Sequence, residues 1–268
     1  MNLRQIKLGN SGTTGIGGSL CYSHQKEITI PSPPIAYHTY QALADAYSEI
    51  APEKEYNAYY DRPAMLSLLD EKLAGQQILD AGCGPGIYSE ILLKKGADVT
   101  GVDVSENMIQ HARTRNGNQG RFIVGNLERP LSMFQDQQFD GVLSALAISY
   151  VKDISTLFGE FQRILKPGAW FCFSTEHPFF SYSYFKLENY FETQAVSCQW
   201  KGFTREPITM HSYYHSLSCI TDALLDNGFV IERILEAKPV AEFEQKHRRA
   251  YAERLKFPSF IHFRARKA

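Results

Sequence analysis

The stretch that decides the fold is Ile78-Leu-Asp-Ala-Gly-Cys-Gly-Pro-Gly86, an apolar run that ends in an acid and opens into glycines. Glycine lets the backbone turn sharply and approach a ligand closely, because it has no Cβ atom to clash. A short apolar segment over 77–80 precedes the loop, and a helical pattern over 88–95 follows it and ends at Gly96. The pattern predicts a buried strand, a tight glycine turn and a helix, which is one unit of an α/β fold.

Strand and helix patterns continue to alternate after this unit. Ser105 is a good N-cap for a helix over 106–115, because its hydroxyl can accept a free backbone N–H. Such alternation is typical of a Rossmann-like α/β architecture, a mostly parallel sheet with helices on both faces. We predict further strands over 99–104, 121–124, 139–145, 170–175, 229–234 and 259–266, and further helices over 154–165, 217–226 and 241–256.

Two segments depart from this pattern. Residues 1–35 are rich in glycine, serine and proline, and we interpret them as a mobile or irregular arm before a domain over 36–268. That domain is expected to begin with helices over 38–49 and 63–74. Residues 178–215 are dense in aromatic side chains and show no long helical period. They predict an insertion after the fifth strand, made of irregular structure or short antiparallel strands.

Size and composition limit the class of protein. The 268 residues suit one domain, and 44% hydrophobic with 21% charged residues is ordinary for a globular chain. With 28 basic and 29 acidic residues the net charge is −1, which disfavours nucleic-acid binding. The five cysteines show no CxxC spacing, so we predict no metal site and a reducing, cytoplasmic setting. No apolar run is long enough for a membrane span, and no signal-peptide pattern opens the chain.

Two carboxylates near the glycine loop narrow its ligand. The third position after Gly84 is Ile87, so the GxGxxG pattern that cradles a dinucleotide pyrophosphate is absent. Asp80, directly before the loop, would repel a pyrophosphate but attract a ligand ammonium. Asp103 follows the second strand, where a carboxylate can accept both ribose hydroxyls. We therefore predict that the glycine loop binds an adenosine ligand that is not a dinucleotide. The alternative for a glycine loop taken by itself is a tight turn between strand and helix that binds no ligand.

With these motifs the chain resembles the class I S-adenosylmethionine-dependent methyltransferases, specifically the small-molecule group with the LDxGCGxG signature, over residues 40–268. The resemblance implies a seven-stranded, mostly parallel sheet whose last strand is antiparallel. It also implies S-adenosylmethionine as methyl donor and S-adenosylhomocysteine as product. The domain over 36–268 would then be a methyltransferase domain, with 178–215 as a lid over the acceptor site.

The resemblance assigns cofactor contacts to matching positions. Gly82, Cys83 and Gly84 would pack against the methionine and ribose, and Asp103 would bind the ribose. The segment from Gly101 to Met108 is similar to the second motif of the family. The third motif is Gly125-Asn-Leu127, in which the family more often has Asp at the second position. The resemblance places the adenine between Val104 and Met108, and places its edge at Asn126 and Leu127.

The segment from Phe139 to Tyr150 resembles the fourth strand of the family and its exit loop, which meets the sulfonium and the acceptor. On this resemblance Ala145 would contact the cofactor and Tyr150 the acceptor. The segment from Glu176 to Phe179 also recurs in relatives. No Asn-Pro-Pro-Tyr or Asp-Pro-Pro-Tyr follows the fourth strand, which disfavours methylation of a nucleobase amine.

His177 is the candidate catalytic base. Methyl transfer depends mainly on positioning and exclusion of water, and a base is needed only for a protonated acceptor such as a phenol or an ammonium. His177 follows the fifth strand and titrates near neutral pH. The alternative is a histidine that holds a neighbouring loop. Glu176 is a second candidate, either to orient His177 or to bind a cationic acceptor.

Aromatic residues supply the remaining candidates. Tyr47 and Tyr60 could cover the cofactor, and Arg62 could pair with its carboxylate; the alternative is a solvated arginine among half-buried tyrosines. The predicted acceptor pocket, for which surface or packing roles are the alternative, contains Tyr150, Phe180, Tyr184, His211 and Tyr214.

An apolar pocket suits a small, partly hydrophobic or aromatic metabolite, methylated at oxygen or nitrogen. We expect a small-molecule acceptor and no nucleic acid or membrane partner, and the sequence leaves the oligomeric state open. The alternative functions are methylation of RNA or protein, and a catalytically silent cofactor-binding subunit.

Overall fold

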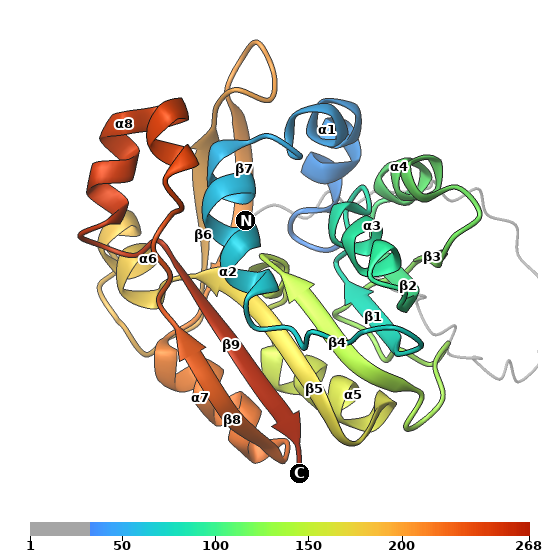
Figure 1. The fold of residues 1–268 in the computed structure, drawn as a ribbon. Helices are drawn as coiled ribbons and strands as arrows, with labels where there is room; N and C mark the ends of the chain where they lie inside the picture. The colour runs from blue at the N-terminus through green and yellow to red at the C-terminus, as the bar shows by residue number, and fades with distance from the viewer. Residues whose placement is uncertain (1–32) are drawn as a thin grey trace, which may run out of the picture. The chain divides into compact units, whose positions relative to one another are not determined.

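The computed structural model describes residues 33–268 and has a seven-stranded sheet at its centre (Figure 1). The strand order is β3-β2-β1-β4-β5-β9-β8. Strands β1 to β5 run parallel, whereas β9 is antiparallel to both of its neighbours, β5 and β8. This confirms the predicted Rossmann-like sheet and its antiparallel last strand. The strands are β1 (Gln77–Ala81), β2 (Asp98–Asp103), β3 (Arg121–Val124), β4 (Phe139–Ala145), β5 (Leu165–Glu176), β8 (Phe229–Leu235) and β9 (Phe260–Lys267).

The glycine-loop strand β1 lies in the middle of the sheet, where both of its faces are covered. Ile78 pairs in register with Val99 of β2 on one side and with Gly141 of β4 on the other. Ile78 and Leu79 are fully buried in different clusters, because successive side chains of a strand point to opposite faces. The run Ile78-Leu-Asp-Ala81 is therefore uniformly buried, as expected for a central parallel strand.

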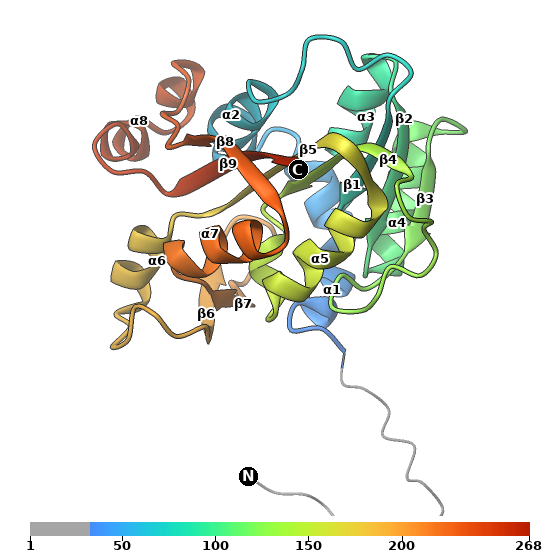
Figure 2. The same ribbon diagram turned by 90° about the horizontal axis from the view of Figure 1, so that it is seen from below.

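Helices cover both faces of the sheet (Figure 2). Apolar side chains of α5 and α7 pack with Leu79 and Phe171 on one face, while α2 and α3 pack with Ile78 and Val99 on the other. Ser105 caps α4 as predicted, since its Oγ accepts the N–H of Met108 at 3.1 Å. Apart from one helix in the aromatic insertion, the α-helices of residues 33–268 are α1 (Tyr37–Ile50), α2 (Arg62–Leu66), α3 (Ile87–Lys94), α4 (Glu106–Asn116), α5 (Ile154–Ile164), α7 (Leu217–Asp226) and α8 (Glu242–Arg254).

The helix predicted over 63–74 is wrong beyond Leu66. A π-helical turn, η1 (Asn57–Asp61), precedes α2, and α2 itself has five residues. The hydroxyl of Ser67 donates to the carbonyl of Ala64 at 2.7 Å, a local hydrogen bond that competes with helical ones. After Ser67 the chain leaves the helix, and Leu68 and Leu73 are buried in the same cluster as Ile78.

The aromatic insertion is ordered. Its strands β6 (Gln194–Trp200) and β7 (Ile208–Tyr214) form an antiparallel hairpin, which confirms the expectation of antiparallel strands. The insertion begins with a helix, α6 (Pro178–Phe185), that the sequence analysis missed because its aromatic residues give no amphipathic period. Met210 of the hairpin packs against Leu43 of α1, so the hairpin stands beside that helix (Figure 1).

The arm predicted over 1–35 lies outside the described residues except for 33–35. Within the described part of the chain, no helix is both long and apolar enough to cross a bilayer.

Gly141 of β4 is predicted to be a position of the sheet that does not tolerate a larger side chain. A Cβ atom built there would fall inside contact distance of the Trp170 indole on β5. We expect Gly141→Ala to lower the free energy of unfolding by about 1 to 3 kcal/mol, because overpacking forces side chains and backbone to shift. Urea unfolding measures the loss.

The matched control is the double variant Gly141→Ala/Trp170→Leu, in which the smaller side chain leaves space for the added methyl group. Its loss should be clearly smaller than the sum of the two single losses. Additive losses would show that the indole is not what excludes a side chain at position 141.

Candidate functional site

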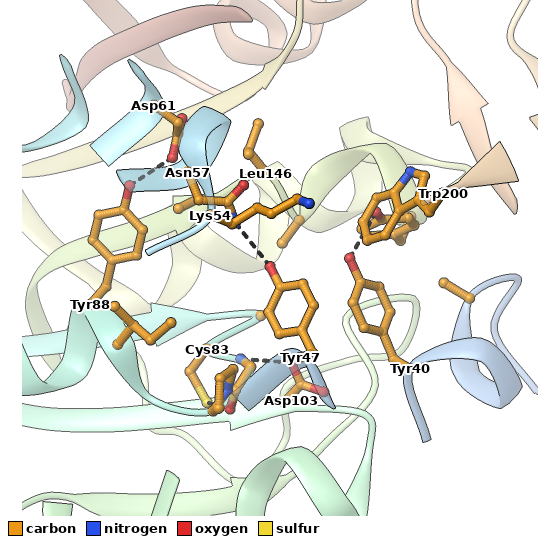
Figure 3. Close-up of a pocket in the computed structure, with 18 of the residues that line it drawn as sticks. Tyr40, Tyr47, Lys54, Asn57, Asp61, Cys83, Tyr88, Asp103, Leu146 and Trp200 are labelled. Carbon is orange, nitrogen blue, oxygen red and sulfur yellow. Dashed lines mark hydrogen bonds between the residues drawn. The ribbon is translucent and has the colours of Figure 1, made fainter. Parts of the chain in front are cut away.

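A cavity of about 560 Å³ opens where the parallel strands end, at the glycine loop between β1 and α3 (Figure 3). Its walls also include residues of α1, of η1 and of the β6–β7 hairpin. Open α/β sheets bind ligands at the carboxyl ends of their strands, and this volume is typical of small-molecule pockets. The geometry therefore makes this cavity the candidate site.

The glycine loop forms one wall of the cavity. Gly82 has a positive φ of 77°, and a Cβ atom there would collide with Ala147. Gly84 also has a positive φ, of 51°, but no atom lies within 4 Å of the position that its Cβ would occupy. Gly82 thus allows close packing behind the loop, while Gly84 leaves open space beside the backbone. Gly82, Cys83 and Gly84 all line the cavity.

Asp103 at the end of β2 is held by the glycine loop. Its Oδ2 accepts the N–H of Gly84 at 2.9 Å, and its Oδ1 accepts the N–H of Ser105 at 2.9 Å. Burial raises the pKa of Asp103, and these backbone donors counter that rise. An ionised carboxylate offers about four acceptor positions. Two are used here, so Asp103 can still accept hydrogen bonds from hydroxyls of a ligand in the cavity.

The predicted adenine contacts divide into two groups. Val104, Asn126 and Leu127 line the cavity. The Oδ1 of Asn126 accepts the N–H of Glu128 at 2.8 Å, which leaves its amide NH₂ as the group available to a ligand. Met108 belongs to α4 and does not line the cavity, because its side chain is buried in the protein interior. Its predicted contact with the ligand is withdrawn.

Arg62 lies in the cavity wall, as predicted, next to a buried carboxylate that the sequence analysis missed. Its two terminal nitrogens donate to the carbonyls of Pro52 and Ala51 at 3.0 and 3.2 Å. Its Nε is buried without a hydrogen-bond partner, which is rare for a buried donor. A ligand carboxylate would satisfy this donor.

The missed carboxylate is Asp61, which is 2% exposed. Its Oδ2 accepts the hydroxyl of Tyr88 at 2.7 Å, and its Oδ1 lies 3.1 Å from Nε2 of His262. Asp61 and Arg62, which are adjacent in the chain, therefore bring an acidic and a basic side chain to the same cavity. The two residues form a charge pattern that matches an amino acid, which carries both an ammonium and a carboxylate.

Asp80 does not line the cavity, which corrects its predicted role at the ligand. Its Oδ2 accepts the hydroxyl of Ser89 at 2.6 Å behind the loop. Burial raises its pKa to about 7, and the charge of Asp103 adds to that rise. Asp80 is therefore a buried structural carboxyl that is partly protonated at neutral pH.

The opposite wall is aromatic and acidic. The hydroxyl of Tyr40, on α1, donates to that of Tyr150 at 2.9 Å, and the Tyr40 ring lies 6.1 Å from Trp200. Tyr47, seven residues after Tyr40, stacks on Phe203 of the hairpin loop at 5.3 Å. Figure 3 shows the rings of Tyr40 and Tyr47 in the cavity. Tyr47, Ala145, Tyr150 and Glu176, which were predicted to contact the cofactor or the acceptor, all line the cavity.

His177 is outside the cavity, so its prediction as a base is wrong. Its Nδ1 accepts the N–H of Phe179 at 3.2 Å and caps α6, while its Nε2 lies 2.8 Å from Glu236. Successive side chains of an extended chain point to opposite sides. Glu176 at the end of β5 faces the cavity, and His177 consequently faces away. The alternative, a histidine that holds a neighbouring segment, is what the structure shows.

Tyr60 and two residues of α6 are also outside the cavity. The hydroxyl of Tyr60 accepts the N–H of Ser259 at 2.9 Å, and its ring packs on Phe260. Phe180 and Tyr184 stack on each other at 5.7 Å, and Tyr184 is 56% exposed. These three side chains therefore do not occupy the positions that their predicted contacts with cofactor or acceptor require.

Two predicted pocket residues on β7, His211 and Tyr214, do not line the cavity. His211 is exposed on the hairpin. Tyr214 is buried, and its hydroxyl donates to the carbonyl of Tyr190 at 2.9 Å. The insertion instead reaches the cavity at the other end of its hairpin, through Gln199, Trp200, Lys201 and Phe203.

Of the aromatic residues that close the cavity, Tyr47 was among the predicted site residues, whereas Tyr40, Tyr88 and Trp200 were not. Tyr40 and Tyr47 are seven residues apart, so a helix places them on one face, and this spacing was a usable signal. Trp200 and Tyr88 gave no comparable signal, because their positions depend on tertiary packing. Among residues 33–268, no cluster of three or more histidine, cysteine or acidic residues is arranged to hold a metal ion.

Comparison with known proteins relates the segment that contains the glycine loop to a family. Residues 79–173 match the family model described as "Methyltransferase domain". The chain is similar to a malonyl-[acyl-carrier protein] O-methyltransferase of Erwinia pyrifoliae, with 34% identity over 137 residues, 50% of this chain and 51% of that protein. A ubiquinone biosynthesis O-methyltransferase of Bordetella avium is 33% identical over 147 residues, 50% of this chain and 61% of that protein. The chain spans about half the length of these curated relatives.

Solved structures share the fold over most of the chain. An S-adenosylmethionine-dependent methyltransferase from Mesorhizobium loti is 26% identical with a TM-score of 0.63, covering 81% of this chain and 99% of that one. A methyltransferase from Aquifex aeolicus is 14% identical with a TM-score of 0.55, and the match covers 84% of this chain and 98% of that one. At that identity the second match concerns the fold alone.

The buried carboxyl of Asp80 predicts a pH-dependent stability of the ligand-free protein. Its folded-state pKa of about 7 lies above the unfolded value of about 4, so the folded protein holds its proton more tightly. Stabilisation by the neutral carboxyl is complete below about pH 4 and is lost as the pH rises through about 7. Between pH 5 and 8 the free energy of unfolding should fall by about 2 to 4 kcal/mol more in the wild type than in Asp80→Asn.

Urea unfolding at several pH values measures this difference. The control is Asp226→Asn, an exposed aspartate at the end of α7, which should keep the wild-type dependence. Identical slopes in the wild type and in Asp80→Asn would contradict the assignment.

Proposed function

Because the chain belongs to the class I S-adenosylmethionine-dependent methyltransferase superfamily, we propose that it methylates an oxygen or nitrogen of a small, partly hydrophobic or aromatic metabolite. The cavity is the observation that carries this proposal. It joins the glycine loop and Asp103 to the aromatic wall around Tyr40 and Glu176 in one partly open cavity. A donor and an acceptor held there would meet in a restricted geometry, which is the main requirement for methyl transfer.

The residues of the cavity fit S-adenosylmethionine, which supplies a methyl group on a positively charged sulfur when bound. Asp103 would accept the ribose hydroxyls, and the open space at Gly84 would admit the ligand beside the backbone. The unpartnered Nε of Arg62 would bind the methionine carboxylate, and Asp61 would face the ammonium. Val104 and Leu127 would contact the adenine.

The acceptor half of the cavity determines what is methylated. Tyr40, Tyr150 and Trp200 would surround the acceptor with rings and exclude water. Because His177 faces away, Glu176 is the ionisable group at this end of β5 that can receive a proton from the acceptor. Burial raises the pKa of Glu176, which makes it a better proton acceptor than an exposed carboxylate.

The curated relatives support methyl transfer but leave the acceptor open. Both relatives are named O-methyltransferases, which favours oxygen, and one is named for a carrier protein. Tyr40, Glu176 and Trp200, however, lie outside the matched residues 79–173. The size of the cavity and the net charge of −1 favour a small acceptor over RNA.

Asp103→Ala is predicted to weaken S-adenosylmethionine binding by about 10- to 100-fold, because hydrogen bonds to the charged carboxylate are lost. Isothermal titration calorimetry measures the affinity. Asp103→Asn should lose less, since its amide oxygen still accepts one hydrogen bond. Asp98→Ala, an exposed residue at the other end of the same strand, is the matched control and should bind like the wild type. Unchanged binding in Asp103→Ala would remove Asp103 from the site.

Methyl transfer itself is tested with methyl-labelled S-adenosylmethionine and a fractionated pool of metabolites. The expected result is one labelled small molecule, absent when Asp103→Ala replaces the wild type. Cofactor binding without any labelled product would favour the silent subunit. Label recovered in RNA or protein would favour the macromolecular alternative.

A further inference from the structure

Glu176 is a half-buried carboxylate that has no cationic partner among residues 33–268. It ends β5 and lines the cavity, and no lysine, arginine or histidine within residues 33–268 forms an ion pair with it. The other charge that acts on it belongs to Asp61, which is also negative. A buried charge is costly unless it is paired, so a ligand cation would stabilise Glu176 more than a neutral group would.

Four basic residues line the cavity, Lys54, Arg62, Lys201 and His247, and none of them forms an ion pair with Glu176. The terminal nitrogens of Arg62 donate to backbone carbonyls. Lys54 lies over the ring of Phe203 at 5.1 Å, with the carbonyl of Lys201 at 3.5 Å from its Nζ. Figure 3 shows the Lys54 side chain entering the cavity from the wall opposite Asp103. The negative charge of Glu176 therefore remains available to a ligand.

Three aromatic residues, Tyr40, Tyr150 and Trp200, line the same cavity as this carboxylate. Burial raises the pKa of both Tyr40 and Tyr150, and the charge of Glu176 adds to the rise in each, which places both hydroxyls in its field. The Tyr40 ring packs edge to face with Tyr150 at 5.3 Å and with Trp200 at 6.1 Å. Aromatic faces attract ammonium groups, and a carboxylate among them is the arrangement that binds organic cations.

We propose that the acceptor is a small amine, bound as its ammonium by Glu176 among the rings of Tyr40, Tyr150 and Trp200. This rests on the proposed function and narrows it from oxygen or nitrogen to nitrogen. It departs from the curated relatives, which are named O-methyltransferases. The departure has a structural basis, because Tyr40, Glu176 and Trp200 lie outside residues 79–173, the segment that matches the family model; of the four residues, Tyr150 lies inside it.

The chemistry balances with the groups present. Glu176 takes one proton from the ammonium, and the freed nitrogen lone pair forms the N–C bond to the methyl group. The C–S bond breaks and its electron pair stays on sulfur, which becomes a neutral thioether. The product leaves as an N-methylammonium ion, and the proton on Glu176 passes to solvent. The tyrosines cannot take this proton at neutral pH, since their raised pKa values keep them protonated.

Binding of matched amines and alcohols tests the proposal without turnover. The probes are ethylamine, benzylamine, phenethylamine and tryptamine, each compared with the alcohol of the same skeleton. Calorimetry is done on the full chain saturated with S-adenosylhomocysteine. We expect at least one amine to bind about 10-fold or more tightly than its alcohol, as expected for a hydrogen bond to a charged group.

Two neighbouring positions supply the matched variants. Glu176→Gln should reduce the preference for amine over alcohol to about 3-fold or less, while Glu176→Asp should keep part of it. His177→Asn is the control, because His177 lies outside the cavity and asparagine also caps helices well. It should keep the wild-type preference.

Three results would overturn the proposal. The first is that no amine binds more tightly than its alcohol, or that none binds at all. The second is a preference that survives in Glu176→Gln. The third is that Glu176→Gln loses only the preference for S-adenosylmethionine over S-adenosylhomocysteine, which would make the sulfonium the partner of Glu176. Failure of the proposed function looks different, since S-adenosylmethionine itself would then not bind or would yield no labelled product.

Discussion

The carboxylate of Asp103 links the two strand ends on which the site is built. It accepts the N–H of Gly84 from the loop after β1 and the N–H of Ser105 at the start of α4. These bonds fix the glycine loop against the end of β2, so the cavity wall has one shape before any ligand arrives. A preorganised wall lowers the entropy lost on binding. The same carboxylate retains free acceptor positions and lines the cavity, so it stabilises the fold without being saturated by it.

The acceptor half of the cavity depends on a second constraint, the alternation of side chains at the end of β5. Strand β5 pairs with β4 and β9 over most of its length, which fixes the face to which each residue points. Glu176 then enters the cavity, while His177 turns to cap α6 and approach Glu236. A one-residue shift of this strand would exchange the two side chains and change the chemistry of the site.

The two halves of the site come from different parts of the chain. The glycine loop, Asp103 and Leu127 lie inside the segment that matches the methyltransferase family model, whereas Arg62 lies before it. Much of the acceptor half comes from α1 and from the β6–β7 hairpin, which pack against each other through Leu43 and Met210. Divergence of these two elements can change the acceptor while the cofactor side stays constant. This division fits the general rule that function resides in sites placed on widely used folds.

The sequence by itself determined the sheet, the glycine loop and several of the residues that line the cavity beside it. Apolar runs, glycines and caps act over a few residues, so Ile78–Gly86, Ser105 and Asp103 could be interpreted locally and were placed correctly. Only the tertiary structure decided which side chains reach the cavity. Asp80 and Met108 turned out to be buried behind it, and His177 points away, whereas Tyr40, Asp61 and Trp200 converge on it from distant segments. The physical reason is that side-chain direction follows from strand pairing and helix packing, which involve residues far apart in the chain.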